Sequence, residues 1–294
     1  MGPGLPAAVL RFAIDIRAFF STIYDMQTGL NLIRDIDTCT VPAGGCALWW
    51  LGQHSFIVKL GGTVVYIDAF LSPHHGRQVE PLLLPEQCVN ADLFLGTHDH
   101  LDHIDRPSWP GMAKAAPQAL FVVPELLRTR VAADLNLPEK RMAGLDLGRS
   151  LKVKDVTVTA IPAAHEFLDR DEATGLYPHL GFIVEGNGFR LYHAGDCCIY
   201  EGMHALLRSQ PFNLFILPIN GRDAHRFSTN IVGNMTYQEA ADLAGDLRPA
   251  AVIPAHYDMF ARNSASAQEF VDYLHVKYPR LHVVVPAHGE RVML

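Results

Sequence analysis

The chain has 294 residues, of which 49% are hydrophobic and 19% charged, so it can bury a sizeable core and is not a disordered chain. A formal net charge of −7, a pI near 6.1 and the lack of any lysine or arginine run argue against nucleic-acid binding. No apolar stretch approaches the length of a membrane span, and the first residues lack the pattern of a signal peptide. Five cysteines without a C-x-x-C pair suit a reducing compartment, so we expect a cytoplasmic protein.

The first 42 residues are predicted to form a helical extension ahead of one larger domain, which spans residues 43–294. Residues 6–26 place apolar side chains at helical spacing, and a second short helix is expected over residues 30–36. The polar face of the first helix lacks the lysine and arginine density that a membrane-surface helix needs. We therefore expect this helix to pack on the main domain or on a second subunit, as a candidate contact for a homo-oligomer.

The larger domain is predicted to be an α/β protein with two strand-rich halves, each followed by helices. Strands are expected at residues 46–51, 54–60, 63–68, 93–96, 120–123, 151–153, 156–161, 180–185, 189–193, 213–219, 251–254 and 282–285. Helices are expected at residues 107–115, 125–135, 236–247 and 265–277. This order favours a sandwich of two sheets with helices on the outside.

One stretch, residues 97–105, carries three histidines and three aspartates within nine residues, directly after a short apolar strand. In an extended loop His98 and His100 point the same way, while Asp102 and His103 follow as the chain turns. Neutral imidazoles and carboxylates are ligands of borderline divalent metals such as Zn²⁺ or Mn²⁺. Because a buried strand leads straight into this H-x-H-x-D-H pattern, a chance cluster on a solvated loop is a poor alternative.

Further candidate ligands stand alone at the ends of later predicted strands: His165, Asp196 and His256. We expect the seven residues to hold two ions, with His98, His100 and His165 on one, Asp102, His103 and His256 on the other, and Asp196 as a bridge. The remaining histidines near strand ends are expected to be structural, although one or two are candidates for a pocket wall: His54, His74, His75, His179, His193 and His288.

These motifs resemble the metallo-β-lactamase fold superfamily, and the resemblance runs from about residue 46 to residue 294. It implies a four-layer αββα sandwich and makes residues 43–294 the hydrolase domain. Four segments are similar to the branch of L-ascorbate-6-phosphate lactonases: Trp49-Trp50-Leu51-Gly52, residues 97–105, Leu191-Tyr192-His193-Ala194-Gly195-Asp196 and Val252-Ile253-Pro254-Ala255-His256. Where that lactonase has an aspartate-rich stretch, this chain has Ala163-Ala164-His165-Glu166, so the ascorbate phosphate substrate is not carried over.

The resemblance and the ligand pattern together predict a metal-dependent hydrolase that opens a small lactone, such as that of a sugar acid. A metal-bridging hydroxide would attack the carbonyl carbon, with Asp102 and Asp196 as the catalytic carboxylates. The leaving alkoxide would take its proton from Asp102 or from one of three nearby groups: Asp258, His179 or Tyr257.

The enzymatic alternative is a phosphodiesterase, including one similar to N-acyl-phosphatidylethanolamine phospholipases, because the same site accepts a phosphate diester. A di-iron electron-transfer protein is disfavoured, since such sites usually carry a carboxylate at the His98 or His100 position, and a non-catalytic metal-binding protein is disfavoured because no ligand is missing. The cations nearest the predicted site are Arg77, Arg106, Arg222 and Arg226. Because the loop at 167–178 is rich in acidic residues, we expect a neutral or singly charged ester as the small-molecule substrate.

Overall fold

A computed structural model describes residues 27–208 and 211–294, and its strands form two mixed sheets of seven strands each. The first sheet has the order β14-β1-β2-β3-β4-β5-β6. Its strands are β1 (Ala47–Gly52), β2 (Ser55–Leu60), β3 (Thr63–Ile67), β4 (Leu93–Leu95), β5 (Leu120–Pro124), β6 (Met142–Leu145) and β14 (Arg291–Met293). From β14 to β3 the pairing is antiparallel, and from β3 to β6 it is parallel.

The second sheet has the order β13-β12-β11-β10-β9-β8-β7. Its strands are β7 (Ser150–Val153), β8 (Val156–Pro162), β9 (Leu180–Gly186), β10 (Phe189–His193), β11 (Leu214–Pro218), β12 (Ala251–Ala255) and β13 (His282–Val283). The pairing is antiparallel from β7 to β10 and parallel from β10 to β13, so the two sheets repeat one pattern.

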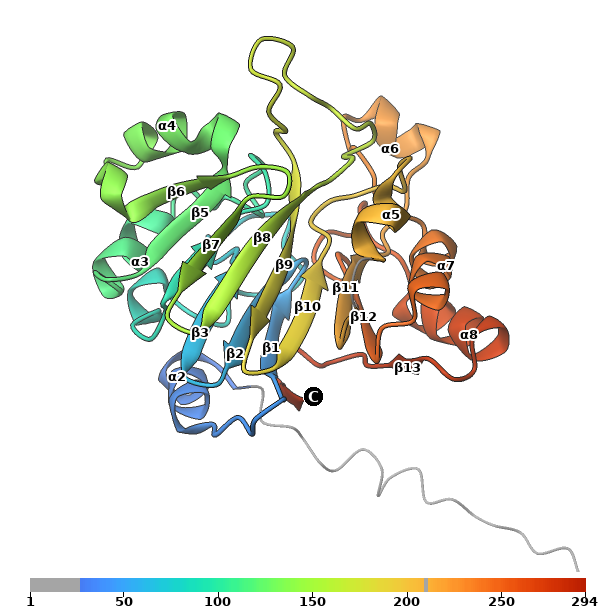
Figure 1. Cartoon of the computed structure of the whole chain (residues 1–294), viewed down its shortest axis with the longest axis horizontal. Coiled ribbons are helices and arrows are strands. Elements are labelled where there is room, and N and C mark those ends of the chain that lie inside the picture. The colour runs from blue at the N-terminus through green and yellow to red at the C-terminus, as the bar shows by residue number, and fades with distance from the viewer. Residues whose placement is uncertain (1–26, 209–210) are drawn as a thin grey trace, which may run out of the picture.

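Helices cover the outer faces of both sheets and complete the predicted αββα sandwich (Figure 1). The helices are α2 (Gly29–Thr38), α3 (Trp109–Ala115), α4 (Glu125–Asp134), α5 (Met203–Leu207), α6 (Ala224–Ser228), α7 (Tyr237–Leu247) and α8 (Ala267–Lys277), with single 3₁₀ turns η1 (Pro85–Gln87) and η2 (Glu139–Arg141). In Figure 1, α3 and α4 lie on one side of the strands and α7 and α8 on the other. Among the described residues, no helix is long and apolar enough to cross a membrane.

The core forms two clusters, one between the sheets that continues beneath the helices of the second sheet, and one beneath the helices of the first sheet. Every residue of β1 is buried, and successive side chains alternate between the two clusters. Leu48 and Trp50 belong to the cluster between the sheets, whereas Trp49 and Leu51 belong to the cluster beneath the helices. Burial on both faces explains why the strand reads as an unbroken apolar run rather than as a polar–apolar alternation.

Most predicted elements are confirmed to within two residues, including the hairpin that pairs Leu60 with Thr63 across two glycines. The sequence analysis missed β6, β14, α5 and α6, which are three to five residues long and too short for a periodic signal. The helix predicted at residues 6–26 lies outside the described residues, whereas the one predicted at 30–36 corresponds to α2. The domain boundary at residue 42 remains a prediction.

Helix α2 is joined to the first sheet by a buried lysine. Lys59 of β2 donates from Nζ to the carbonyl oxygens of Ile36 (2.7 Å) and Asp37 (3.2 Å), in the last turn of α2. A cation at the C-terminal end of a helix satisfies carbonyls that have no partner within the helix. The indole of Trp49 adds a second link through its hydrogen bond to Asp35 (2.8 Å).

We predict that Lys59→Met lowers the free energy of unfolding by about 1.5–3 kcal/mol, the range for hydrogen bonds to charged groups, because the buried carbonyls of α2 lose their donor. Denaturant unfolding measures the loss. The exposed Lys114→Met on α3 is the control, expected to change stability by less than about 0.5 kcal/mol. Equal losses from the two variants would contradict the role given to Lys59.

Candidate metal centre

The structure brings the seven predicted ligands together where strands of both sheets end. They form two groups, His98, His100, His165 and Asp196 in one and Asp102, His103 and His256 in the other. Within each group the candidate ligand atoms all lie within 4.8 Å of one another. The side chains come from the loops that follow β4, β8, β10 and β12, so residues up to 158 positions apart meet at one edge of the sandwich.

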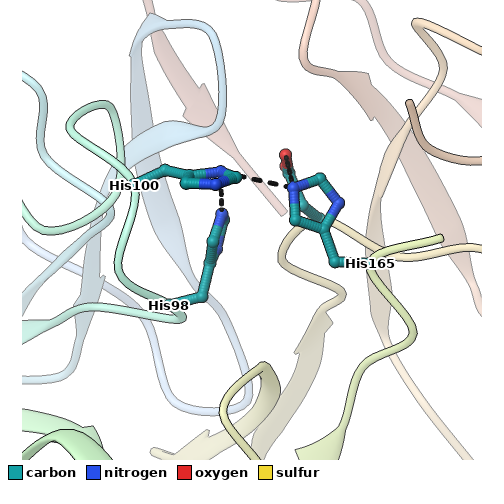
Figure 2. Close-up of side chains that lie close together, drawn as sticks. His98, His100 and His165 are labelled. Carbon is teal, nitrogen blue, oxygen red and sulfur yellow. Dashed lines mark hydrogen bonds and ion pairs between the residues drawn. The ribbon is translucent and has the colours of Figure 1, made fainter. Parts of the chain in front are cut away.

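The first group consists of imidazole nitrogens that face one another. His98 and His100 come from one loop and His165 approaches from the opposite side, as Figure 2 shows. His98 Nε2 lies 2.8 Å from His100 Nδ1, which lies 3.3 Å from His165 Nε2. Burial lowers the pKa of His98 well below its usual range and that of His165 to about 4. Both rings are therefore neutral at pH 7, with lone pairs free for a metal ion.

Asp196 faces both groups with different carboxylate oxygens. Its Oδ1 lies 3.3 Å from His103 Nε2 and 3.1 Å from His256 Nε2, whereas its Oδ2 lies 3.7 Å from His165 Nε2. Although burial opposes the charged form, His256 and His103 hold the pKa of Asp196 well below its usual range. A carboxylate placed in this way can touch two ions at once.

Atoms that lack a hydrogen-bond partner indicate that the centre suits metal ions. Within the described part of the chain, His103 Nε2 and Asp196 Oδ1 are buried and form no hydrogen bond, and their near polar neighbours are other candidate ligands at 3.1–3.3 Å. Buried polar atoms are normally satisfied, because leaving one without a partner costs about 1–3 kcal/mol. Here both atoms point into the cluster, and imidazole and carboxylate are the donor types that Zn²⁺ and Mn²⁺ accept. The residues present therefore fit a pair of divalent ions.

Asp68, which the sequence analysis did not single out, fixes the orientation of His103. Its Oδ2 accepts hydrogen bonds from His103 Nδ1 (2.7 Å) and Thr97 Oγ1 (2.8 Å), and its Oδ1 accepts one from the Thr97 backbone (2.8 Å). This bond leaves His103 Nε2 directed at the cluster, as in many metal sites where a carboxylate orients a histidine ligand. Asp68 has a left-handed backbone (φ 46°) and directly follows β3, a position after a strand that is its one local signal in the sequence.

The three aspartates of residues 97–105 have three different roles. Asp102 lies in the cluster, with its Oδ2 3.7 Å from His103 Nε2 and 3.9 Å from His256 Nε2. Asp105 is buried and accepts from the backbone of Leu71 and Ser72 (2.8 Å each), which ties the motif to the loop after β3. Asp99 instead forms ion pairs with arginines at positions 106 and 130.

The other histidines divide between structural positions and the wall of a cavity. His193 is buried and donates from Nε2 to the His54 carbonyl (2.9 Å), a structural role. His74 and His75 stack on each other, with 4.4 Å between ring centroids, and both line a cavity of about 870 Å³ above the cluster. The outer wall of this cavity also contains Leu101, Thr229, Asn230, Ile231, Val232, Phe260 and Arg262.

The structure changes the expectation about nearby cations. None of the four predicted arginines is among the residues that line the cavity, because each is bound elsewhere. Their partners are the carbonyls of Phe70 and Val79 for Arg77, Asp99 and Asp134 for Arg106, Glu239 for Arg222, and Asp223 with nearby carbonyls for Arg226. Arg262 lines the cavity instead, is exposed, and has no hydrogen bond or ion pair with any described residue.

Comparison with known proteins identifies the family. The family model for the beta-lactamase superfamily domain matches residues 63–257. A UPF0173 metal-dependent hydrolase of Cupriavidus taiwanensis is 32% identical over 273 residues, covering 85% of this chain and 88% of that protein. Another, from Archaeoglobus fulgidus, is 27% identical over 244 residues, covering 82% and 96%. The structure of Igni18, a metallo hydrolase from Ignicoccus hospitalis, aligns with a TM-score of 0.66 at 22% identity and covers 85% of this chain and 98% of that one.

The chain therefore belongs to the beta-lactamase superfamily and, within it, to the UPF0173 metal-dependent hydrolases. The likeness to Igni18, at 22% identity, adds support for the fold alone. A metal-dependent family agrees with two groups of clustered donors at the strand ends. The closer similarity to L-ascorbate-6-phosphate lactonases remains a prediction.

We predict that the purified protein binds about two transition-metal ions per chain. Because the Asp196 carboxylate faces both groups of donors, Asp196→Ala should reduce metal content at both positions and abolish turnover. Elemental analysis of protein purified without chelator measures the content. His193→Ala, three residues away and bound to a backbone carbonyl, is the control and should retain most of the metal. Equal losses from the two variants would remove the reason for choosing Asp196 as the bridge.

We also predict that Asp68→Asn weakens metal binding at the position of His103 by about 10–100-fold, the range for residues that orient a metal ligand. Competition with a chromogenic chelator measures the affinity at each position. Because the asparagine can still accept from Thr97, the fold should be kept, which circular dichroism would check. Unchanged affinity at both positions would show that His103 does not depend on this carboxylate.

Proposed function

We propose that this protein hydrolyses a small carboxylic ester, namely a lactone, at a dinuclear metal centre. The observation that carries the proposal is Asp196, whose two carboxylate oxygens face separate groups of donors beneath one cavity. His98, His100 and His165 would hold one ion, Asp102, His103 and His256 the other, and Asp196 both. When bound, such ions supply a hydroxide nucleophile near neutral pH and polarise the carbonyl oxygen of the substrate.

The chain itself would position the substrate and return a proton to the leaving group. Of the four predicted proton donors only Asp102 lines the cavity, whereas Asp258, His179 and Tyr257 do not. Tyr257 is buried against the indole of Trp50, with 4.8 Å between ring centroids, which removes it from the substrate. Although burial opposes the charged form, His103 and His256 hold the pKa of Asp102 below its usual range, so the group starts as a carboxylate. We therefore assign to Asp102 a proton relay: it would accept the proton of the hydroxide once that has added to the carbonyl carbon, and pass it to the alkoxide that leaves when the ring opens.

The cavity wall supports a substrate with little negative charge. A phosphate diester gains from arginines placed for charge-assisted hydrogen bonds, and the four arginines nearest in sequence are committed to internal partners. Arg262 is the one arginine or lysine among the described residues of the wall. One exposed guanidinium matches a neutral ester or one with a single anionic group, such as the carboxylate of a sugar acid.

A lipid phosphodiester is the second candidate, and exposed aromatic residues favour it. Phe167 and Phe227 are 67% and 62% exposed. Phe227 lines a smaller cavity of about 250 Å³, which shares Ile231 and Val232 with the cavity above the cluster. Exposed apolar side chains beside a catalytic cavity suit an acyl chain, so phosphodiester substrates belong in the test.

Kinetics with a panel of neutral and carboxylate-bearing lactones beside bis(p-nitrophenyl) phosphate decide between these substrates. We expect a larger kcat/KM for a lactone, and a much larger value for the phosphodiester would contradict the lactonase proposal. Arg262→Gln should raise KM up to about fivefold for anionic lactones only, since exposed ion pairs contribute about 0.2–1 kcal/mol. Arg280→Gln, which is exposed and outside the cavity wall, is the control.

A further inference from the structure

Gln53 occupies the turn between β1 and β2 in a conformation that its own residue type does not favour. It is fully buried and has a left-handed backbone, with φ 53°. A non-glycine residue in this region costs about 1–2 kcal/mol, and such strain persists where surrounding contacts hold it. Two hydrogen bonds hold it, one of them from a candidate ligand: the Gln53 carbonyl accepts from the backbone N–H of His256 (2.9 Å) and from the indole of Trp50 (3.0 Å).

The side chain of Gln53 reaches the second group of donors. Its Nε2 lies 2.9 Å from Asp102 Oδ2 and 3.1 Å from His256 Nε2, so the amide faces two of the three members of that group. Its Oε1 is buried and has no hydrogen-bond partner among the described residues. One end of the amide thus contacts both candidate ligands while the other end is left unsatisfied.

The chemistry of an amide explains why this arrangement suits an ion. The nitrogen is a donor and the oxygen an acceptor, and a half-turn about the last side-chain bond exchanges them. With the nitrogen inward, the N–H groups bind the lone pairs of Asp102 and His256 that an ion would otherwise take. With the oxygen inward, the same side chain presents a carbonyl to the ion, and carbonyl oxygens suit Mn²⁺ better than they suit Zn²⁺.

We propose that Gln53 is an eighth ligand-forming residue, whose Oε1 binds the ion at the position of Asp102, His103 and His256 and favours Mn²⁺ over Zn²⁺ there. This inference rests on the dinuclear centre of the proposed function. It differs from a purely positional role, in which the amide N–H groups would hold Asp102 and His256 in place. The two roles make opposite demands on the atom that faces the site, oxygen in one case and N–H in the other.

Two substitutions separate these roles. Gln53→Asn keeps an amide and tolerates a left-handed backbone, but it is one methylene shorter and withdraws the oxygen. Gln53→Glu keeps the length and offers only oxygen. Gln268→Asn, at an exposed position on α8, is the matched control. Each metal-free variant would be titrated separately with Mn²⁺ and Zn²⁺, with stoichiometry from elemental analysis, Mn²⁺ sites followed by electron paramagnetic resonance, and folding checked by circular dichroism.

We expect two Mn²⁺ sites in the wild type and in the control. In Gln53→Asn, the affinity of the second site for Mn²⁺ should fall at least tenfold, and its affinity for Zn²⁺ should fall less. Gln53→Glu should retain the second Mn²⁺. An equal loss in both Gln53 variants would overturn ligation by oxygen, as would full Mn²⁺ affinity in Gln53→Asn. Fewer than two ions in the wild type would overturn the dinuclear centre itself, and the assignment of Gln53 with it.

Discussion

The carboxylate of Asp196 holds the centre together, because it lies against histidines delivered by both sheets. His103 comes from the loop after β4 of the first sheet, and His165 and His256 come from loops after β8 and β12 of the second. Each of these polar groups is buried, and burial without compensation is unfavourable. The two sheets must therefore pack at one fixed separation for the cluster to exist, so the apolar core between them and the donor cluster at its edge depend on the same geometry.

The contrast between the cluster and the cavity wall explains why the family is easier to recognise than the substrate. The candidate ligands lie in loops that directly follow strand ends, which the hydrogen-bonded sheets hold rigidly. The outer wall is built from loops around positions 74–76, 229–232 and 260–263, which lie outside the strands of both sheets. Side chains of those loops contribute to the shape and charge of the cavity and are not candidate ligands. Membership of a metal-dependent family thus defines the chemistry, and the loops define what reaches it.

Most of the site could be predicted from the sequence, because its residues carry local signals. The pattern of residues 97–105 and the lone polar residues after strands identify seven side chains that the structure places together. Asp68 and Gln53 were not identified in this way, because neither belongs to the histidine-rich pattern and their contacts with His103 and His256 are visible only in the fold. The arginines show the opposite error: sequence proximity to the site suggested a role, but Arg77 and Arg226 point toward backbone carbonyls of their own loops.

Left-handed backbone conformations recur beside the donors, at Gln53 (53°), Asp68 (46°) and His256 (60°) as well as in the glycine before Asp196 (62°). At the three non-glycine positions this conformation costs about 1–2 kcal/mol each, and the surrounding contacts must hold it. The packing of the sandwich therefore holds these residues in a backbone geometry that their residue types do not favour. Glycine at Gln53, Asp68 or His256 would relax the backbone, but it would remove a side chain that faces the candidate site. Stabilising this edge of the fold and preserving its chemistry are therefore competing demands.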